Sequence, residues 1–266
     1  MSPTAYEAIA DQLFSGSVLE FMERLTGGVS ADVYRCDLRL ADGTRHPVVL
    51  RVHGATHSGH SAELEYQLLE ALHRKGIPVP KPLMVDPSGS LLKDPCLVMS
   101  FVDGTTTIPA GKERGHIEVM AGTLKKIHGS STSDLPDLPG RNNPLPEVLE
   151  YLPAGPDWTD LRNHLESRQV ETYRGAPKLL HGDFWPENLL WRDGSVVAVL
   201  DWEDAAIGDP LSDVAAARVE LRYRFGKQAM AWFTEAYTRQ EALDPERLAL
   251  WQVYVASAAQ RFMGEW

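Results

Sequence analysis

The chain has 266 residues, of which 43% are hydrophobic and 24% are charged, and its formal net charge is −11 at pH 7. These fractions are ordinary for a folded globular protein and exclude a disordered or fibrous chain. The negative charge argues against binding to a nucleic acid polymer or an anionic membrane, because both rely on a basic surface.

Two cysteines, Cys36 and Cys96, are too few for a disulfide framework or a cysteine-based zinc site. No stretch reaches the roughly 18 consecutive apolar residues that a membrane-spanning helix requires. Residues 1–13 lack the basic-then-apolar pattern of a signal peptide. We therefore expect a cytoplasmic protein without a membrane partner.

The first third of the chain predicts a small antiparallel sheet. Apolar and polar residues alternate in its first strand, and Asp42-Gly43 is a strong hairpin-turn signal before the next one. One helix is expected over residues 61–75, where four leucines share a face, Ser61 is suited to cap the first turn and Gly76 follows the end. The expected strands cover residues 31–40, 47–52, 81–86 and 96–102.

From residue 116 onward the pattern is mainly helical. A Ser- and Pro-rich connection over 130–160 is expected to hold a single helical turn, and residues 179–200 to hold two short strands. Helices are expected over residues 116–128, 161–173 and 211–224, and in later segments through 261. These patterns predict an α+β protein, with a small β-sheet lobe containing one helix over residues 1–102 and a larger helical lobe over 103–266.

A polar block between two apolar strands carries the residues best suited to chemistry. His181, Asp183 and Asn188 lie in one tight loop, and Asp201 ends the β-branched strand that follows. An Asp on a short rigid loop can take a proton from an alcohol, and carboxylate and amide oxygens suit Mg²⁺. This set is typical of phosphoryl transfer, in which positioning and charge neutralisation supply most of the catalysis.

The block resembles the catalytic loop, His-Gly-Asp-x-x-x-x-Asn, of the aminoglycoside phosphotransferase and choline kinase-like family. The motif reads His181-Gly182-Asp183-Phe184-Trp185-Pro186-Glu187-Asn188. The segment from Asp201 through Gly208-Asp209-Pro210 to Asp213 is similar to the family's metal-binding motif and the helix start after it. The resemblance covers about residues 20–261 and implies a bilobal protein kinase-like fold.

This resemblance implies roles for the matching residues. Asp183 would be the catalytic base or hydroxyl-orienting residue, and Asn188 and Asp201 would bind Mg²⁺. Glu203 is either a further metal ligand or a solvated or locally paired acid. His181 is expected to brace the loop by hydrogen bonds. The implied activity is transfer of the γ-phosphoryl group of ATP or GTP to a hydroxyl of a small molecule.

The β-rich lobe is implied to bind the nucleotide. A glycine turn would cover the phosphates, because missing side chains let backbone N–H groups approach, although the three-glycine loop of protein kinases is absent. In the segment matching the interlobe hinge, backbone groups of Ser100 and Val102 would hydrogen-bond the adenine edge, with Met99 behind it. The implied nucleotide residues are Gly27, Gly28, Ser30, Met99, Ser100 and Val102.

One departure from protein kinases concerns the phosphate-gripping Lys of the third strand. Arg51 occupies the matching position, and Arg binds phosphate bidentately without being equivalent to Lys. We expect Arg51 to pair with Glu65 of the following helix and to hold the α- and β-phosphates. Glu63 is the alternative partner, because the helix register is not settled by the sequence.

Three histidines, His53, His57 and His60, follow Arg51 in a Gly- and Ser-rich segment. A zinc site would need a more rigid support, so a loop over the nucleotide is the preferred interpretation.

The acceptor is expected to be a small molecule and not a peptide. Fewer than ten residues separate Asp201 from Asp209, which leaves no room for the segment with which protein kinases dock a peptide. Acidic and tryptophan side chains of the helical lobe suit a polycationic antibiotic or a choline-like amine, and also a neutral sugar or a macrolide. The acceptor therefore stays open, because a fold does not determine a substrate.

Two other classes of function stay open at this point. One is a pseudokinase that binds nucleotide without phosphotransfer, although Asp183, Asn188 and Asp201 are all intact. The other is a kinase-fold partner domain, linked to acyl-CoA or another coenzyme, that evolved beside a metabolic enzyme.

Overall fold

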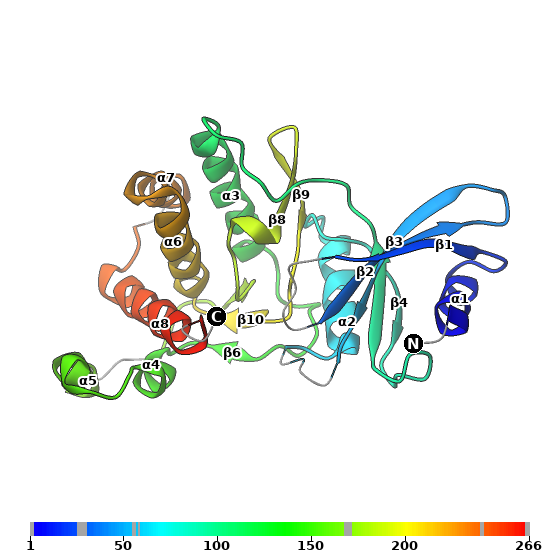
Figure 1. Cartoon of the computed structure of the whole chain (residues 1–266). Helices are drawn as coiled ribbons and strands as arrows, with labels where there is room; N and C mark the ends of the chain where they lie inside the picture. The colour runs from blue at the N-terminus through cyan, green and yellow to red at the C-terminus, as the bar shows by residue number, and fades with distance from the viewer. Residues whose placement is uncertain are drawn as a thin grey trace. The chain divides into compact units, whose positions relative to one another are not determined.

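The computed structural model describes residues 3–25, 31–54, 57, 59–167, 172–239 and 242–263. The chain divides into two compact units (Figure 1). The first consists of Met1–Gly104, Asp134–Pro136 and Val197–Asp204, and the second of Thr105–Ser133, Asp137–Val196 and Ala205–Trp266.

The segment Val197–Asp204 therefore belongs to the first unit, whereas a single division after residue 102 would place it in the second. Backbone hydrogen bonds explain the difference. Val199 N donates to Pro78 O at 2.7 Å, and His60 N donates to Glu203 O at 3.0 Å. The segment that carries Asp201 is thus held by the β-rich part of the chain.

The first unit is built on a five-stranded antiparallel sheet in the order β1-β2-β3-β5-β4. At the β2–β3 hairpin, Thr44 N donates to Asp42 Oδ1 and Gly43 has a φ of 85°, as the Asp-Gly signal requires. The strands are β1 (Val18–Arg24), β2 (Asp32–Arg39), β3 (Arg45–Val52), β4 (Pro82–Asp86) and β5 (Cys96–Ser100).

Two helices accompany this sheet, α1 (Pro3–Leu13) and α2 (Ala62–Arg74). The sequence analysis missed α1 and β1; α1 buries Ile9 and Ala10 in the hydrophobic core of the sheet. Helix α2 begins as expected, with the Ser61 hydroxyl accepting a hydrogen bond from Leu64 N at 3.2 Å. Its buried face includes Glu65 among leucines and alanines, so this carboxylate needs a charged partner.

Both cysteines are buried and free. Burial raises the pKa of Cys36 to about 12 and that of Cys96 to about 11. Both thiols therefore stay protonated at neutral pH and pack as apolar core residues.

The second unit is mainly helical. Its long helices are α3 (Glu113–His128), α6 (Leu211–Phe225), α7 (Lys227–Thr238) and α8 (Pro245–Met263). The 130–160 connection holds more structure than the expected single turn, namely α4 (Leu145–Tyr151), the start of α5 (Thr159–Ser167) and a 3₁₀ helix, Pro156–Trp158. Apolar side chains of α4, α5 and α8 pack together around the buried Val148 and Leu165, which explains why this region is ordered.

Short strands frame the polar block. Strands β6 (Gly140–Arg141), β10 (Ala206–Gly208) and β7 (Lys178–Leu180) form one small sheet, and β8 (Leu189–Arg192) pairs with β9 (Ser195–Val199). The block between β7 and β8 is thereby held at both ends. The observed mixture of an antiparallel sheet and a helical part confirms the expected α+β class.

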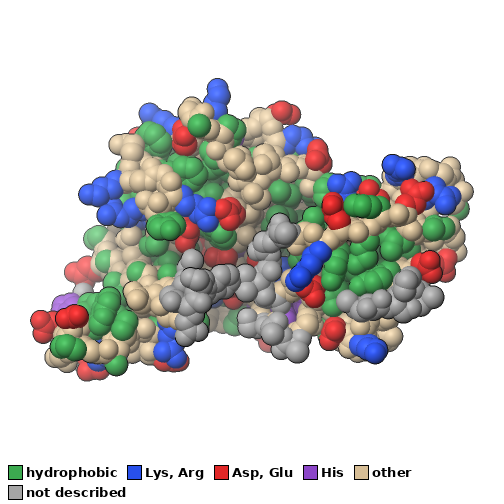
Figure 2. All heavy atoms as spheres, viewed as in Figure 1, with side chains coloured by type: hydrophobic (Ala, Val, Ile, Leu, Met, Phe, Trp, Pro, Cys, Tyr) green, Lys and Arg blue, Asp and Glu red, His purple; other side chains and the backbone are tan. Residues whose placement is uncertain are grey.

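Acidic and basic side chains are intermixed on the visible face of both units (Figure 2). The net charge of −11 is therefore not gathered into one acidic patch on this face. Among the described residues, no helix has the length and apolar character needed to cross a bilayer.

Candidate active site

In the second unit, a buried carboxylate anchors the loop over residues 181–188. Asp213, on the first turn of α6, is fully buried and accepts hydrogen bonds from His181 N at 2.8 Å and Gly182 N at 2.9 Å. His128 Nε2 donates to the same carboxylate at 3.1 Å. Burial alone would raise the pKa of Asp213, but His128, His181 and the backbone donors lower it below its ordinary value. The anchor is therefore a charged group at neutral pH.

The backbone of the loop is held from a second side. Gly182 adopts a φ of 92°, in the left-handed region that favours glycine, and its carbonyl accepts a hydrogen bond from Arg141 Nη1 at 3.0 Å. His181 is fully buried, and its Nδ1 accepts from Asp183 N at 3.3 Å. His181 thus braces the loop, as the sequence predicted.

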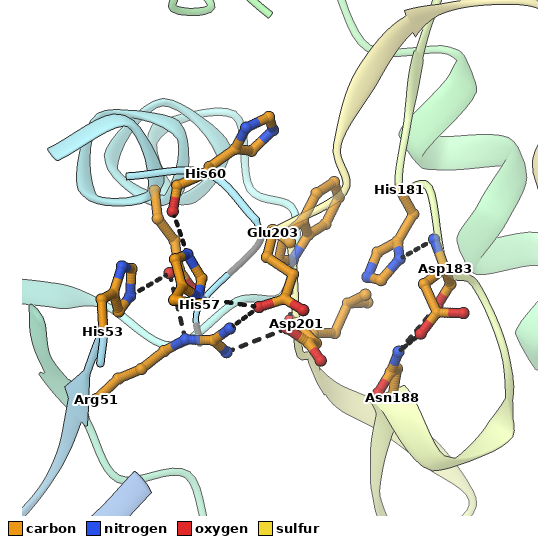
Figure 3. Close-up of polar contacts among 12 residues, drawn as sticks. Arg51, His53, His57, His60, His181, Asp183, Asn188, Asp201 and Glu203 are labelled. Atoms are coloured by element: carbon orange, nitrogen blue, oxygen red, sulfur yellow. Dashed lines mark hydrogen bonds and ion pairs between the residues drawn. The ribbon is translucent and has the colours of Figure 1, made fainter. Parts of the chain in front are cut away.

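These contacts present Asp183 in a defined orientation (Figure 3). Its Oδ2 accepts hydrogen bonds from Trp185 Nε1 and from Asn188 Nδ2, each at 3.0 Å. Asn188 Nδ2 also donates to the Asp183 carbonyl at 2.9 Å. Both interactions use the amide nitrogen of Asn188. Its amide oxygen can therefore still accept a hydrogen bond or bind a metal.

A cation covers the outer side of this loop. The Arg224 guanidinium lies 4.6 Å from the centre of the Trp185 ring and forms ion pairs with Glu187 and Glu220. Trp185 is thus held between Arg224 and the carboxylate to which it donates. The sequence analysis did not identify Trp185 and Arg141 as residues that hold the loop.

In the first unit, three carboxylates surround one guanidinium. Arg51 lies on β3 and is 7% exposed; its Nη1 donates to Asp201 Oδ1 at 3.1 Å and its Nη2 to Glu203. Arg51 Nε lies 3.4 Å from Glu65 Oε2. The partner on α2 is therefore Glu65, whereas Glu63 is exposed.

Burial and charge act in opposite directions in this cluster. Burial alone would lower the pKa of Arg51, but Glu65, Asp201 and Glu203 raise it above its ordinary value. Burial would raise the pKa of Glu65, but Arg51, His53 and His57 lower it. Arg51 and Glu65 are therefore both charged at neutral pH, although both are buried.

Asp201 has an unusual backbone conformation, with a φ of 60°. Such a conformation is uncommon in a residue other than glycine, although Asp and Asn adopt it more readily than other residues. The turn is held by the contact of Asp201 with Arg51 and by the hydrogen bond from His60 N to Glu203 O.

The histidine segment lies against the Asp201–Glu203 turn. His53 is 5% exposed, with Nε2 3.2 Å from Glu65 Oε2, and its ring centre lies 4.1 Å from that of His57. His57 Nδ1 lies 3.8 Å from Glu203 Oε2. These two histidines thus lie against the acids of the cluster, and a signal for His53 was present: it follows the last residue of β3, two positions after Arg51. Among the described residues, no three His, Cys, Asp or Glu side chains gather so as to hold a metal ion.

The remaining residues of the predicted nucleotide site form two groups. Gly27, Gly28 and Ser30 fall outside the described residues. Met99 is buried in β5, and Ser100 N donates to Lys81 O at 2.8 Å. Ser100 can therefore offer a nucleotide only its carbonyl and not its N–H group.

A family model described as "Phosphotransferase enzyme family" matches residues 22–251. The chain therefore belongs to this family of phosphotransferases. This confirms the resemblance identified from the two motifs, and with it the expected class of enzyme, a small-molecule kinase.

Several solved structures share the fold. A putative aminoglycoside phosphotransferase from Ralstonia eutropha is 20% identical, with a TM-score of 0.71 over 99% of this chain and 87% of its own. Macrolide 2'-phosphotransferase type I is 16% identical, with a TM-score of 0.71 over 98% of this chain and 91% of its own. A thermostable mutant of aminoglycoside phosphotransferase APH(4)-Ia, in ternary complex with ADP and hygromycin B, is 16% identical, with a TM-score of 0.68 over 98% and 92%. The expected protein kinase-like fold is thereby confirmed.

Curated relatives are much longer than this chain. Acyl-CoA dehydrogenase family member 10 of Mus musculus is 28% identical over 198 residues, which cover 59% of this chain and 16% of the relative. Acyl-CoA dehydrogenase family member 11 of Homo sapiens is 29% identical over 176 residues, which cover 59% of this chain and 22% of the relative. The chain thus matches about a fifth or less of either protein.

The anchoring role of Asp213 predicts a pH-dependent loss of stability in Asp213→Asn. The amide can accept from one backbone N–H group but not from both, so we expect the free energy of unfolding to fall by about 1–3 kcal/mol at pH 7. The ordinary pKa of 3.8 is lowered in the folded protein, so the stabilisation is present above pH 3.8 and is lost as the pH falls through the folded value. Urea unfolding should show a constant difference from wild type between pH 5 and 8 that narrows below 3.8; a difference that grows on acidification would contradict the assignment.

The close approach of the histidine segment to Glu203 predicts that Gly59 tolerates no side chain. A Cβ at Gly59 would lie 2.5 Å from Glu203 Cβ, whereas a Cβ at Gly54 would meet nothing within 4 Å. We expect Gly59→Ala to lower the free energy of unfolding by about 1–3 kcal/mol, and the matched control Gly54→Ala to leave it within about 0.5 kcal/mol of wild type. Equal denaturation midpoints for the two variants would disprove the contact.

Proposed function

We propose that the protein is a cytoplasmic phosphotransferase that moves the γ-phosphoryl group of ATP or GTP to a hydroxyl of a small molecule, with Asp183 as the base. The observation that carries this proposal is the orientation of Asp183: its Oδ2 accepts from Trp185 and Asn188, on a loop whose backbone N–H groups are held by the buried Asp213. Membership in a phosphotransferase family supports it.

Asp183 would orient the acceptor hydroxyl and take its proton. The acceptor oxygen forms a bond to the γ-phosphorus, the bond between that phosphorus and the β,γ-bridging oxygen breaks, and the hydroxyl proton passes to the Asp183 carboxylate. The two hydrogen bonds to Oδ2 fix the direction in which the carboxylate points, which a base needs in order to meet the acceptor hydroxyl.

Asn188 and Asp201 would hold Mg²⁺. Both offer oxygen donors of the kind that Mg²⁺ prefers, and a set of two protein ligands suits an ion that keeps waters and binds substrate phosphates. Bound Mg²⁺ would neutralise charge on the transferring phosphates. Asp201 Oδ1 is held by Arg51 Nη1 at 3.1 Å, which orients the carboxylate. Glu203, paired with Arg51 and beside His57, would support that arrangement.

Arg51 would bind the nucleotide phosphates together with the turn that contains Gly27, Gly28 and Ser30. Its Nη1 and Nη2 each carry two N–H bonds and each donates to one carboxylate, so the guanidinium has donor capacity left for a phosphate. The adenine or guanine ring would lie against Met99, with the Ser100 carbonyl and the Val102 backbone at its edge. A structure of similar fold holds ADP, which supports a nucleoside di- or triphosphate here.

The acceptor would enter a cavity of about 230 Å³ in the second unit. Arg141, which donates to Gly182 of the catalytic loop, lines this cavity together with Tyr151 and Tyr254. Glu147 is the one acidic side chain among the described lining residues. One cation, one acid and aromatic rings suit a neutral or singly charged hydroxyl compound better than a polycation.

The experiment that tests the function measures substrate-stimulated ADP or GDP release with Mg²⁺. The acceptor panel should contain aminoglycosides, macrolides, choline, sugars and hydroxy acids. It should also contain hydroxyacyl-CoA thioesters, because curated relatives are named for acyl-CoA dehydrogenases. Nucleotide binding without transfer to any acceptor would favour the pseudokinase alternative.

For the catalytic base, we expect Asp183→Asn to lower kcat by about 10²–10⁴-fold. The amide keeps an oxygen to accept from Trp185 and Asn188, so the loop should keep its shape and nucleotide affinity should be unchanged. The matched control is Asp193→Asn, an exposed turn residue of the same unit. A turnover equal to that of the control would disprove the role of Asp183.

For the metal ligand, we expect Asp201→Asn to weaken the affinity for the Mg²⁺–nucleotide complex by at least about tenfold, or about 1.4 kcal/mol. The amide oxygen can still accept from Arg51, so the loss should come from the missing charge. In a calorimetric titration, the loss of affinity should be much smaller when the nucleotide is added in EDTA. The matched control is Asp204→Asn, which alters an exposed acid in the same turn and should leave the affinity unchanged. Equal losses with and without Mg²⁺ would argue against metal binding.

A further inference from the structure

The second unit contains a cavity of about 690 Å³ whose lining is rich in cations. It lies where the end of α3, the start of α6, the end of α7 and the start of α8 come together. Lys125, Arg174, Lys178 and Arg247 contribute positive side chains. Such a grouping is unexpected in a chain whose net charge is −11.

The two acids in the described lining, Asp209 and Asp244, have partners other than the lysines. Asp209 is fully buried and accepts hydrogen bonds from Arg247, from Leu211 N and from Trp251 Nε1. Asp244 Oδ1 caps α8 by accepting from the backbone N–H groups of residues 246 and 247. Neither carboxylate therefore neutralises the lysines.

Lys125 and Lys178 carry the uncompensated charge. Both are half-buried, and neither has a carboxylate partner among the residues that the structure describes. Lys178 is fixed by its strand, where it pairs with Gly208 of β10, and Lys125 by the last turn of α3. Two ammonium groups that line one cavity repel each other, and an anion bound between them would relieve that repulsion.

The other walls provide apolar surface and size. Leu211, Leu243 and Tyr237 line the cavity, and its volume falls in the range of small-molecule sites, about 300–1,000 Å³. We propose that this cavity binds a small organic anion carrying two or more phosphate or carboxylate groups, held by Lys125 and Lys178.

This anion site is separate from the catalytic loop but connected to it. No described residue of the 181–188 loop lines the cavity. His128 does line it, and its Nδ1 is 2.7 Å from the Tyr237 hydroxyl while its Nε2 donates to Asp213, the anchor of the loop. The proposal rests on the cavity alone and does not depend on the phosphotransferase activity.

The test uses the whole chain in EDTA and two probes, inorganic pyrophosphate and citrate, titrated calorimetrically at low salt. We expect saturable binding of at least one probe to the wild-type protein. The double variant Lys125→Gln/Lys178→Gln should weaken that binding at least tenfold. The matched control is Lys126→Gln, which alters an exposed lysine next to Lys125 and should bind like wild type.

Arg51→Met, used only after circular dichroism shows that it folds despite leaving Glu65, Asp201 and Glu203 without this partner, separates this site from the proposed nucleotide site. Binding that persists in Arg51→Met and is lost in the lysine variants supports the proposal. The absence of saturable binding to both probes overturns it, as does binding that Arg51→Met abolishes and the double variant keeps. If the double variant fails to fold, the probe affinities of Lys125→Gln and of the charge-preserving Lys125→Arg are compared instead. Only Lys125→Gln should weaken binding, and equal affinities for the two variants would overturn the proposal.

Discussion

The buried guanidinium of Arg51 holds together the functional part of the first unit. Its three nitrogens contact Glu65 on α2 and Asp201 and Glu203 on the segment that returns late in the chain. A buried Glu without such a partner would be expensive in free energy, and so would a buried Arg. The pairs therefore constrain one another, and removing any one member leaves another charge buried without compensation. The cluster thus links α2, β3 and the Asp201 turn, which backbone hydrogen bonds to Pro78 and His60 also hold.

A second buried charge organises the second unit in the same manner. Asp213 holds the backbone of His181 and Gly182, and His128 Nε2 donates a further hydrogen bond to its carboxylate. The loop that carries Asp183 is thus fixed through its backbone, while the Asp183 carboxylate is oriented by Trp185 and Asn188. Positioning of this kind matters in phosphoryl transfer, because placement and electrostatics supply most of the rate.

The sequence predicted these features to different degrees, for physical reasons. The candidate loop over residues 181–188 was identified because its residues are close in the chain, and α2 because Ser61 and the leucine spacing are local signals. Helix α1 was missed, since its stability comes from Ile9 and Ala10 packing on a distant sheet. The choice of Glu65 over Glu63 needed the helix register. The return of residues 197–204 to the first unit depends on hydrogen bonds between residues more than 100 positions apart, for which no local pattern exists.

The number of carboxylates that contact residue 51 explains why β3 carries an Arg where protein kinases have a Lys. A Lys ammonium is a compact point charge, whereas the guanidinium presents its donors in a planar fork. Arg51 directs Nε toward Glu65, Nη1 toward Asp201 and Nη2 toward Glu203, so each acid contacts a different nitrogen. A Lys at this position could balance the charge but could not hold three carboxylates in separate directions. The same fork holds Asp201 through Nη1 at 3.1 Å. The departure from the protein kinase pattern at residue 51 therefore follows from the three acids that converge on this guanidinium.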